Sequence, residues 1–361
     1  MNILHLINYA GLGGSEHYVL NLLESQSKKN SCHLVYGIDG GLLNIIKNHK
    51  IKTKQMNMKH PFDFMAVNKL SDYCKANKID VIHCHYPREN CIAAFVKKRN
   101  PKIKLIYTAH LNEPCGKLWK KLNSFAAKYD NKIISVCNAQ IPQLVENGFP
   151  KEKIKVIYNG VPTNEYSDKT KIKAQEELRA EFSIPKHVPI ICSVTRFEPI
   201  KGVPFLVRAM AHYTKIEPIE AKLIIVGNGS QFDEIKEMIR SMRLEKYIIC
   251  TGYREDADRI AAGADIYINS SESEAMSLAL LNAGANGAAC IATNVGGNAD
   301  LLSDDCGILV EYGDTEELAR AIDVLVCKDE LRNEYSKKIR KKILNGFTVD
   351  KMLSETLKLY K

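Results

Sequence analysis

Two basic residues in the second half of the chain are spaced so that both could contact one diphosphate. Arg196 and Lys201 stand five positions apart, between an apolar run and a helical pattern. An arginine grips phosphate oxygens with a planar fork, while a lysine acts as a point charge. Such a pair would stabilise a diphosphate leaving group, on which negative charge builds in the transition state. A solvated pair of loop residues is the alternative.

Residues 268–284 join an acidic loop to an apolar helical pattern that starts near Ala275–Ser277. The first N–H groups of a helix have no partner within it and attract anions. Glu274 stands at the predicted helix start, where its carboxylate could accept hydrogen bonds from ligand hydroxyls. The alternative is that Glu274 only caps the helix.

Three glycine-containing turns follow apolar runs, at Gly13 and Gly14, at Gly227, and at Gly296. In parallel α/β sheets, such turns place ligand-binding loops at the carboxyl ends of the strands. The first turn lacks the dinucleotide fingerprint because Glu16 stands where a third glycine is required. A nicotinamide-dependent dehydrogenase is therefore disfavoured. The turn still permits a phosphate to approach a helix start, with a plain tight turn as the alternative.

These loops require strands to position them, and apolar runs alternate with amphipathic stretches along the chain, as in doubly wound parallel sheets. The predicted strands of the first half are Ile3–Ile7, His33–Tyr36, Val81–His83, Leu105–Thr108, Ile133–Val136 and Val156–Tyr158. Those of the second half are Ile190–Val194, Leu223–Val226, Ile248–Thr251, Ile266–Asn269, Ala289–Thr293 and Ile308–Val310. Turn-forming residues 159–168 separate the two sets. Two sets of six strands in 361 residues predict two Rossmann-like domains.

The net charge of +9 is distributed unevenly. Residues 1–170 carry 25 Lys+Arg and 13 Asp+Glu, a net of +12, whereas residues 171–361 carry 26 and 29, a net of −3. A basic half could meet nucleic acid or an anionic membrane surface. The basic residues are scattered and no nucleic-acid-binding motif occurs, so we do not expect nucleic acid as a partner. A basic surface without a specific partner is the alternative.

The cysteines and the N-terminus bear on the compartment. The 11 cysteines form no Cys-x-x-Cys pair, which predicts free thiols and neither a disulfide framework nor a zinc site. Six of them lie in or beside apolar runs, where we expect burial: Cys32, Cys84, Cys137, Cys192, Cys250 and Cys290. No apolar stretch approaches the ~20 residues of a membrane span, and the N-terminus reads as a strand, not a signal peptide. We therefore expect a cytoplasmic protein.

A series of motifs follows in a characteristic order along the chain. They are Gly13-Gly-Ser-Glu16, Asp80-Val-Ile-His-Cys-His85, Tyr107-Thr-Ala-His110, Ile154-Lys-Val-Ile-Tyr-Asn-Gly-Val161, Thr195-Arg-Phe-Glu-Pro-Ile-Lys-Gly202, Ile225-Val-Gly-Asn-Gly229, Ser273-Glu-Ala-Met-Ser-Leu278 and Val295-Gly-Gly297. This order resembles the retaining glycosyltransferases of family 4, over nearly the whole chain. The motifs of the second half are the more specific ones.

The resemblance implies the α/β GT-B fold, in which two Rossmann-like, doubly wound parallel-sheet domains face each other across a cleft. It implies an N-terminal acceptor-binding domain, residues 1–165 with about 346–361, because the C-terminal helix crosses back to it. Residues 166–345 would form the nucleotide-sugar-binding domain. The donor would be a nucleoside-diphosphate sugar, with a UDP-sugar favoured, and the transferred group a hexose or N-acetylhexosamine. No metal or other cofactor is expected, since basic side chains and helix dipoles neutralise the diphosphate in this fold.

Residue roles are also implied by the resemblance. Arg196 and Lys201 would grip the diphosphate, Glu274 would bind sugar hydroxyls, and His110 would contact the sugar near the reacting carbon, so these four are the catalytic candidates. A structural strand-end histidine is the alternative for His110. The other residues implied in nucleotide-sugar binding are Gly13, Gly14, Gly227, Tyr253, Arg254, Ala275, Met276, Ser277, Leu278 and Asn282. Of these, Tyr253 and Arg254 would lie near the base.

The chain departs from the family pattern at Asn282, where a second Glu would bind the ribose hydroxyls. An amide can still accept and donate hydrogen bonds, so we expect weaker or altered ribose contact. The substitution leaves open a non-catalytic partner subunit. A sugar-nucleotide epimerase with the same fold is the other alternative.

A basic amphipathic segment near residue 120 is the candidate acceptor or membrane surface. Lys117, Trp119, Lys120 and Lys121 lie around an apolar face predicted from Leu118, Leu122 and Phe125. Such a helix is typical of contact with an anionic membrane, and a core-facing helix is the alternative. Glycan or lipid-linked acceptors of the family favour a position at the inner face of the membrane.

Overall fold

The computed structural model describes residues 1–46, 50–162, 167–216 and 220–361. The chain divides into a first unit, Met1–Gly160 with Val349–Lys361, and a second unit, Val161–Thr348. The predicted boundary at residues 165 and 166 touches residues 163–166, which lie outside the described residues. Within the described part of the chain, no helix is both long and apolar enough to cross a membrane.

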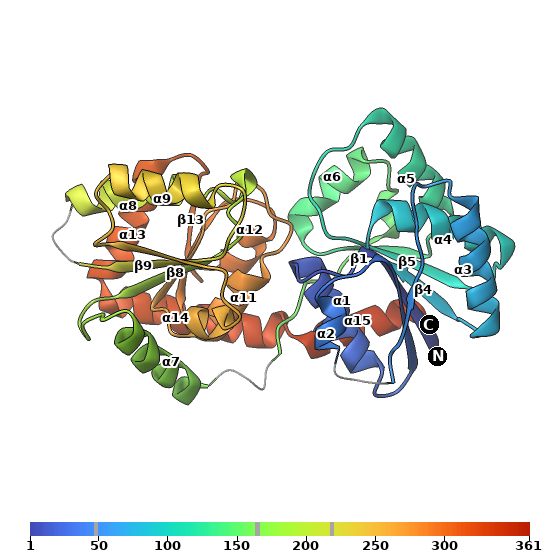
Figure 1. Ribbon diagram of the computed structural model, residues 1–361, viewed down its shortest axis with the longest axis horizontal. Helices are drawn as coiled ribbons and strands as arrows, with labels where there is room; N and C mark the ends of the chain where they lie inside the picture. The colour runs from blue at the N-terminus through green and yellow to red at the C-terminus, as the bar shows by residue number, and fades with distance from the viewer. Residues whose placement is uncertain (47–49, 163–166, 217–219) are drawn as a thin grey trace. The chain divides into compact units, whose positions relative to one another are not determined.

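The first unit is built on a parallel sheet (Figure 1), and its strand order is β3-β2-β1-β4-β5-β6-β7. Its strands are β1 Asn2–Tyr9, β2 Ser31–Ile38, β3 Lys52–Gln55, β4 Val81–Cys84, β5 Lys104–Ala109, β6 Lys132–Ser135 and β7 Ile154–Val156. Its helices are α1 Gly14–Gln26, α2 Leu42–Ile45, α3 Phe64–Ala76, α4 Pro87–Arg99, α5 Lys117–Tyr129, α6 Ile141–Glu146 and α15 Val349–Tyr360, with 3-10 turns η1 Asn138–Gln140 and η2 Lys151–Lys153.

Successive side chains of a strand point to opposite faces of this sheet, and each face is covered by its own hydrophobic core. Leu4 and Leu6 pack on the side of α3, α4 and α5, whereas Ile3 and Ile7 pack on the side of α1 and α15. Because both faces are buried, the strands read as continuous apolar runs. The final helix α15 completes the second of these cores with Met352 and Tyr360.

The second unit holds a six-stranded parallel sheet of order β10-β9-β8-β11-β12-β13. Its strands are β8 Ile190–Val194, β9 Lys222–Val226, β10 Ile248–Gly252, β11 Ile266–Asn269, β12 Ala289–Thr293 and β13 Ile308–Val310. Its helices are α7 Asp168–Glu181, α8 Val203–Ile216, α9 Phe232–Ser241, α10 Ala257–Ala262, α11 Leu278–Ala285, α12 Gly297–Leu302, α13 Thr315–Cys327 and α14 Asp329–Gly346, with the 3-10 turn η3 Pro199–Lys201. Helices α8, α9 and α13 cover one face, while α7, α11 and α14 cover the other (Figure 1).

The prediction of two doubly wound parallel sheets is confirmed, but the first sheet has seven strands instead of six. The missed strand is β3, whose four residues, Lys-Thr-Lys-Gln, are all exposed. It pairs with β2 at the edge of the sheet and buries no side chain, so it leaves no hydrophobic signal in the sequence.

All 11 cysteines are free, as predicted. Five of the six expected to be buried are buried, and Cys250 is half-buried. Cys250 belongs to β10, an edge strand of the second sheet, where one side of the strand has no neighbour.

Candidate active site

In each sheet, the strand order changes direction beside the first strand of the unit. Strand β8 lies between β9 and β11, and β1 lies between β2 and β4. Loops that leave such neighbouring strands toward opposite faces open a crevice at the carboxyl ends, which is where α/β sheets bind ligands. The predicted residues Arg196, Lys201 and Glu274 follow β8 and β11, so the topology brings them to one such position.

The loops after β8 and β11 are hydrogen-bonded to each other. The Glu272 amide donates to the Ile200 carbonyl at 2.8 Å, and the Ser270 hydroxyl donates to the Lys201 carbonyl at 3.1 Å. The next residue, Gly202, has φ +63°, and a Cβ there would lie 2.1 Å from the Ser270 carbonyl oxygen. Only glycine permits this close approach, a requirement that the sequence analysis did not assign to Gly202.

Lys201 and Glu274 form an ion pair in this crevice. Lys201 Nζ lies 2.6 Å from Glu274 Oε1, and the Ser271 hydroxyl donates to the same oxygen at 2.9 Å. Both side chains are mostly covered, with exposed fractions of 17% and 13%. An ammonium carries three donors, so Lys201 can contact an anion while it holds Glu274 in place.

Glu274 does not cap the following helix, so that alternative is wrong. Helix α11 begins at Leu278, and its N-cap is Ser277, whose hydroxyl accepts from the Leu280 amide at 3.2 Å. The predicted start near Ala275–Ser277 is thus slightly early, because Ala275 and Met276 run into the loop in nonhelical conformation. Glu274 is left to face Lys201.

Two further glycines hold neighbouring loops against these residues. At Gly296, with φ +50°, a Cβ would lie 1.7 Å from the Glu274 carbonyl oxygen. At Gly227, with φ +138°, a Cβ would lie 1.8 Å from the Thr195 carbonyl oxygen. The loops after β9 and β12 therefore pack directly on those after β8 and β11. Both glycines permit close backbone packing, and Gly296 packs against Glu274 itself.

Arg196 is exposed on the same loop as Lys201. Between them, Phe197 is fully buried, and its amide donates to the Asn228 carbonyl at 3.0 Å. Hydrogen bonds from Ser230, together with the charge of Arg196, lower the pKa of Glu198. Arg196 has no ion pair within the described ranges, so its guanidinium is available to a ligand at the loop.

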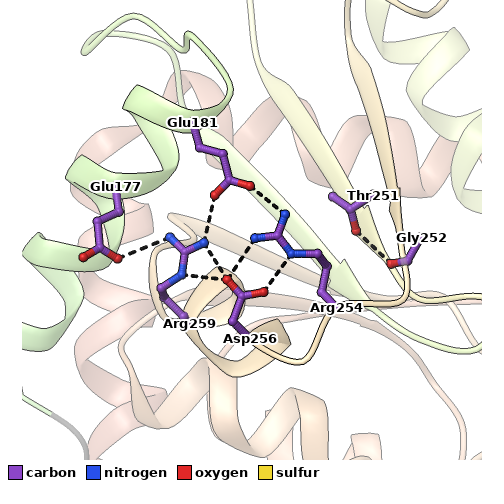
Figure 2. Close-up of polar contacts among 7 residues, drawn as sticks. All are labelled: Glu177, Glu181, Thr251, Gly252, Arg254, Asp256 and Arg259. Atoms are coloured by element: carbon purple, nitrogen blue, oxygen red, sulfur yellow. Dashed lines mark hydrogen bonds and ion pairs between the residues drawn. The ribbon is translucent and has the colours of Figure 1, made fainter.

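The predicted base-binding pair, Tyr253 and Arg254, follows β10. Tyr253 is 65% exposed, whereas Arg254 is engaged by carboxylates: its Nη1 lies 2.6 Å from Glu181 and its Nε lies 2.7 Å from Asp256. Arg259 contacts the same two carboxylates, and Figure 2 shows the two guanidinium groups interleaved with them. The fork of Arg254 is therefore held inside a surface network.

Asp256 is the N-cap residue of α10, but its side chain makes no capping hydrogen bond. Its carboxylate accepts from Arg254 and Arg259 instead (Figure 2). The hydrogen bonds from Arg254 are the main reason that the pKa of Asp256 is strongly lowered. Two guanidinium groups outcompete the helix amides for one carboxylate.

Asn282, where the family pattern has its second Glu, lies on α11. Its amide Nδ2 donates to the carboxylate of Asp258 on α10 at 3.3 Å. A carboxylate is therefore present beside position 282, although it comes from a different helix. The sequence carried no sign of this, because the two residues are 24 positions apart.

In the first unit, helix α1 begins at Gly14 with Gly13 as its N-cap, as the glycine turn indicated. The carboxylate of Glu16, only 5% exposed, turns back to this end. It accepts from the Tyr86 hydroxyl at 2.9 Å and from the Ser15 hydroxyl at 3.0 Å. A Cβ at Gly13 would lie 2.6 Å from Glu16 Oε2, so a negative group already occupies the helix start considered for a phosphate.

His110 follows β5 and belongs to a cluster of four histidines with His5, His83 and His85. Burial lowers the pKa of His110 to about 3 and that of His5 to about 4, so these rings are neutral at pH 7. Within the described residues, His5, His83 and His85 are the one group of three side chains placed closely enough to share a metal ion.

This cluster was not predicted from the sequence, although a signal was present. His83 and His85 alternate to the same face of the chain, and His5 pairs with His83 across β1 and β4. Three histidines in otherwise apolar strands could have indicated a shared buried site. What the sequence lacked was the register between β1 and β4.

The basic segment near residue 120 forms helix α5, and most of its apolar side faces the core. Leu122 is buried, and Trp119 and Phe125 are half-buried against the core of the first unit. Leu118 is 67% exposed, so the predicted single apolar face is wrong at this position. Lys120 pairs with Glu146 at 2.9 Å, which leaves Lys117 and Lys121 as exposed charges beside Leu118.

Comparison with known proteins identifies the two units. Residues 12–165 match the family described as "Glycosyltransferase Family 4", and residues 174–342 match the family described as "Glycosyl transferases group 1". The chain belongs to glycosyltransferase family 4. It is 25% identical over 307 residues to N-acetyl-alpha-D-glucosaminyl L-malate synthase of Bacillus anthracis, covering 83% of this chain and 79% of that protein.

A second relative of this family 4 glycosyltransferase is the UDP-Gal:alpha-D-GlcNAc-diphosphoundecaprenol alpha-1,3-galactosyltransferase of Escherichia coli. The two are 26% identical over 310 residues, which cover 82% of this chain and 79% of the relative. The crystal structure of Anabaena Alr3699/HepE in complex with UDP matches with a TM-score of 0.87 at 20% identity over 99% of both chains. A glycosyltransferase from Rickettsia africae matches with a TM-score of 0.86 at 24% identity, over 100% of this chain and 98% of that one. The fold is GT-B.

Proposed function

We propose that this glycosyltransferase moves a hexose or N-acetylhexosamine from a nucleoside-diphosphate sugar, in the first place a UDP-sugar, to a sugar or a lipid-linked envelope or polysaccharide acceptor. The observation that carries the proposal is the contact of Lys201 with Glu274, beside Arg196, at the carboxyl ends of β8 and β11. The UDP-galactose donor named for the Escherichia coli relative and the UDP bound to the Anabaena protein favour a uridine nucleotide.

The roles of the three side chains follow from their chemistry. Lys201 and Arg196 would neutralise the diphosphate as the bond between it and the anomeric carbon breaks. Glu274, held by Lys201, would accept hydrogen bonds from hydroxyls of the transferred sugar. The acceptor oxygen forms the new bond on the face that the diphosphate leaves, and its proton goes to a donor phosphate oxygen. This gives retention of configuration, and in our proposal two basic side chains take the place of a metal ion.

The ribose would be bound by Asn282 together with Asp258. The Asp258 carboxylate lies against the Asn282 amide and supplies the acceptor oxygens that an amide alone provides less well. Asn282 also motivates a second candidate, a glycosyltransferase-like partner subunit without activity of its own. Donor affinity separates the two, since such a subunit would not bind the nucleotide sugar.

The first unit would bind the acceptor substrate. Exposed Leu118, flanked by Lys117 and Lys121, supports contact of α5 with an anionic membrane at the cytoplasmic face. The name of the Escherichia coli relative gives a diphosphoundecaprenol-linked sugar as its acceptor, which favours a lipid-linked acceptor here.

A thermal-shift panel with UDP-, GDP- and ADP-sugars tests the donor. A ligand that binds the native state raises the melting temperature, and we expect the largest rise with a UDP-sugar. The Lys201→Ala variant should lose most of that rise. Hydrolysis or transfer of the sugar is then followed for the donor that stabilises most. No stabilisation by any of the three classes would contradict the proposed activity and favour the partner subunit.

A further inference from the structure

A continuous chain of hydrogen bonds joins Gln26 to His110 through two buried rings. His5 Nε2 lies 2.9 Å from Gln26 Oε1, and His5 Nδ1 lies 3.0 Å from His85 Nε2. His85 Nδ1 in turn lies 3.1 Å from His110 Nε2. His5 and His85 are fully enclosed, whereas His110, at the carboxyl end of β5, is only half-buried. This series of hydrogen bonds therefore runs from the interior of the first unit to the carboxyl end of its sheet.

The direction of these hydrogen bonds is set at the Gln26 end. The Gln26 carbonyl oxygen can only accept, so His5 carries its proton on Nε2 and has a lone pair on Nδ1. A neutral His85 must then donate from Nε2 to His5 and keep a lone pair on Nδ1. By the same step, His110 donates from Nε2 and keeps its lone pair on Nδ1. A neutral imidazole has one N–H and one lone pair, so the hydrogen bond at one nitrogen fixes the direction of the hydrogen bond at the other.

A second branch is hydrogen-bonded to the amide nitrogen of Gln26 and agrees with this direction. Gln26 Nε2 donates to the Tyr360 hydroxyl, and that hydroxyl donates to His83 Nδ1 at 2.6 Å. His83 Nε2 then donates to the Thr108 hydroxyl at 2.7 Å. Burial keeps His83 neutral, because it lowers the pKa of this ring far below the usual value. Helix α15 thus reaches the histidine chain through Tyr360.

We propose that Gln26, His5 and His85 are positioning residues that hold His110 in the Nε2–H tautomer, so that its Nδ1 is a hydrogen-bond acceptor for a substrate hydroxyl. Within the described part of the chain, no hydrogen bond reaches His110 Nδ1. The ligand assignment, a sugar hydroxyl, rests on the proposed function, whereas the tautomer does not. We call the hydrogen-bonded series Gln26, His5, His85 and His110 the relay, because each hydrogen bond fixes the direction of the next.

The same geometry speaks against a metal ion as the purpose of the cluster. Both ring nitrogens of His5, His83 and His85 already have partners at hydrogen-bond distance. A bound cation would displace several of these contacts and would place a charge among fully enclosed groups. The contacts instead account for every nitrogen of the three rings.

NMR of the full chain with 15N-labelled histidine tests the tautomer without any substrate. Long-range proton–nitrogen correlations distinguish a protonated ring nitrogen from one with a lone pair, and the His110→Asn variant identifies the His110 signals. At pH 7 we expect protonated Nε2 and unprotonated Nδ1 for His5, His85 and His110. A wild-type His110 or His85 protonated at Nδ1 would overturn the relay, whatever the protein's activity.

Breaking the relay at its far end gives a second readout. Gln26→Met removes the acceptor for His5, so His110 should show both tautomers, and the donor KM should rise about three- to tenfold with kcat nearly unchanged. Glu24→Met on the same helix is the matched control and should change neither. A single unchanged His110 tautomer in folded Gln26→Met would also overturn the proposal. Absence of any transfer by the wild type would refute the proposed function alone, because the NMR result stands without it.

Discussion

The carboxyl ends of the two sheets carry polar groups of opposite kinds. In the first unit, the clustered His5, His85 and His110 are neutral and joined to one another by hydrogen bonds, and His5 and His85 are fully enclosed. In the second unit, Lys201 and Glu274 are charged and paired, and Arg196 is exposed beside them. Neutral buried groups define a direction of donors and acceptors, whereas charged groups near solvent can accept a new ionic partner. The first unit therefore holds a buried polar scaffold, whereas the second unit holds a site suited to an anionic ligand.

The largest expected effect is on the charged side of this comparison. Lys201→Ala removes a cation that would face the departing diphosphate, and kcat/KM should fall about 10²- to 10³-fold, or ~3–4 kcal/mol of transition-state stabilisation. Steady-state transfer assays measure the loss. Lys246→Ala, which breaks an exposed pair with Glu220 in the same unit, is the control and should leave the rate unchanged. An undiminished rate in Lys201→Ala would contradict the assignment.

On the neutral side, Asp130 tests whether the first unit buries groups in their uncharged form. Burial raises the pKa of Asp130 to about 7, against 3.8 for an ordinary Asp, although Asn90 donates to it at 3.0 Å. Between these values the folded state holds a proton that the unfolded state has lost, so the free energy of unfolding decreases as pH rises. The slope reaches at most about 1.4 kcal/mol per pH unit.

Asp130→Asn should remove this decrease, so the variant gains stability relative to the wild type between about pH 4 and 7. Thermal unfolding over that range provides the measurement. Exposed Asp72→Asn, in α3 of the same unit, should leave the slope as it is. Parallel pH profiles for wild type and Asp130→Asn would show that Asp130 is ionised in the fold.

The loop packing around Glu274 is tested by two glycines with positive φ. Gly296→Ala places a methyl group 1.7 Å from the Glu274 carbonyl oxygen, whereas Gly313→Ala, at φ +93°, meets nothing within 4 Å. Both variants bear the backbone cost of about 1–2 kcal/mol. Gly296→Ala should lose about 1–3 kcal/mol more and should raise the donor KM. Equal melting temperatures for the two variants would contradict the packing argument.

The surface charge of the first unit is a separate property from its neutral interior. Lys117→Glu combined with Lys121→Glu should weaken binding to anionic liposomes at least about 30-fold in flotation, since two basic residues near such a surface together contribute ~2 kcal/mol. Lys151→Glu with Lys155→Glu makes the same change of charge elsewhere in the first unit. Equal loss in the two double variants would indicate a general charge effect and no specific role of α5.

The smallest expected effect lies in the network of Figure 2. Asp256→Asn should cost about 1 kcal/mol at pH 7, because a partly exposed carboxylate gains little beyond its hydrogen bonds to Arg254 and Arg259. The pKa of Asp256 is lowered in the fold, so its contribution is present above pH 4 and is lost as pH falls through the folded pKa. Glu237→Gln, which breaks the isolated pair with Arg240, should cost nearly nothing. A cost for Asp256→Asn that stays constant as pH falls below 4 would contradict this account.

The predictions from sequence were most accurate where burial leaves a strong pattern. Eleven predicted runs match strands, the predicted run Val156–Tyr158 overlaps β7 only at Val156, and β3 escaped because all its side chains face solvent. Arg196, Lys201 and Glu274 were singled out because each lies in a loop between an apolar run and a helical pattern. The contacts of Asp256 could not be predicted from the sequence, because it meets two arginines, one of which also pairs with Glu177 and Glu181 from a distant helix.

The sequence by itself determined the α/β class, the free thiols, the family and the loops that carry the charged residues. These properties depend on local patterns of apolar, polar and glycine residues, which the chain order preserves. Only the tertiary structure decided that Lys201 meets Glu274, that Asp258 stands beside Asn282, and that four histidines form one hydrogen-bonded cluster. Such contacts depend on strand order and register across tens of residues, and hydrogen-bond direction depends on atoms a few ångströms apart.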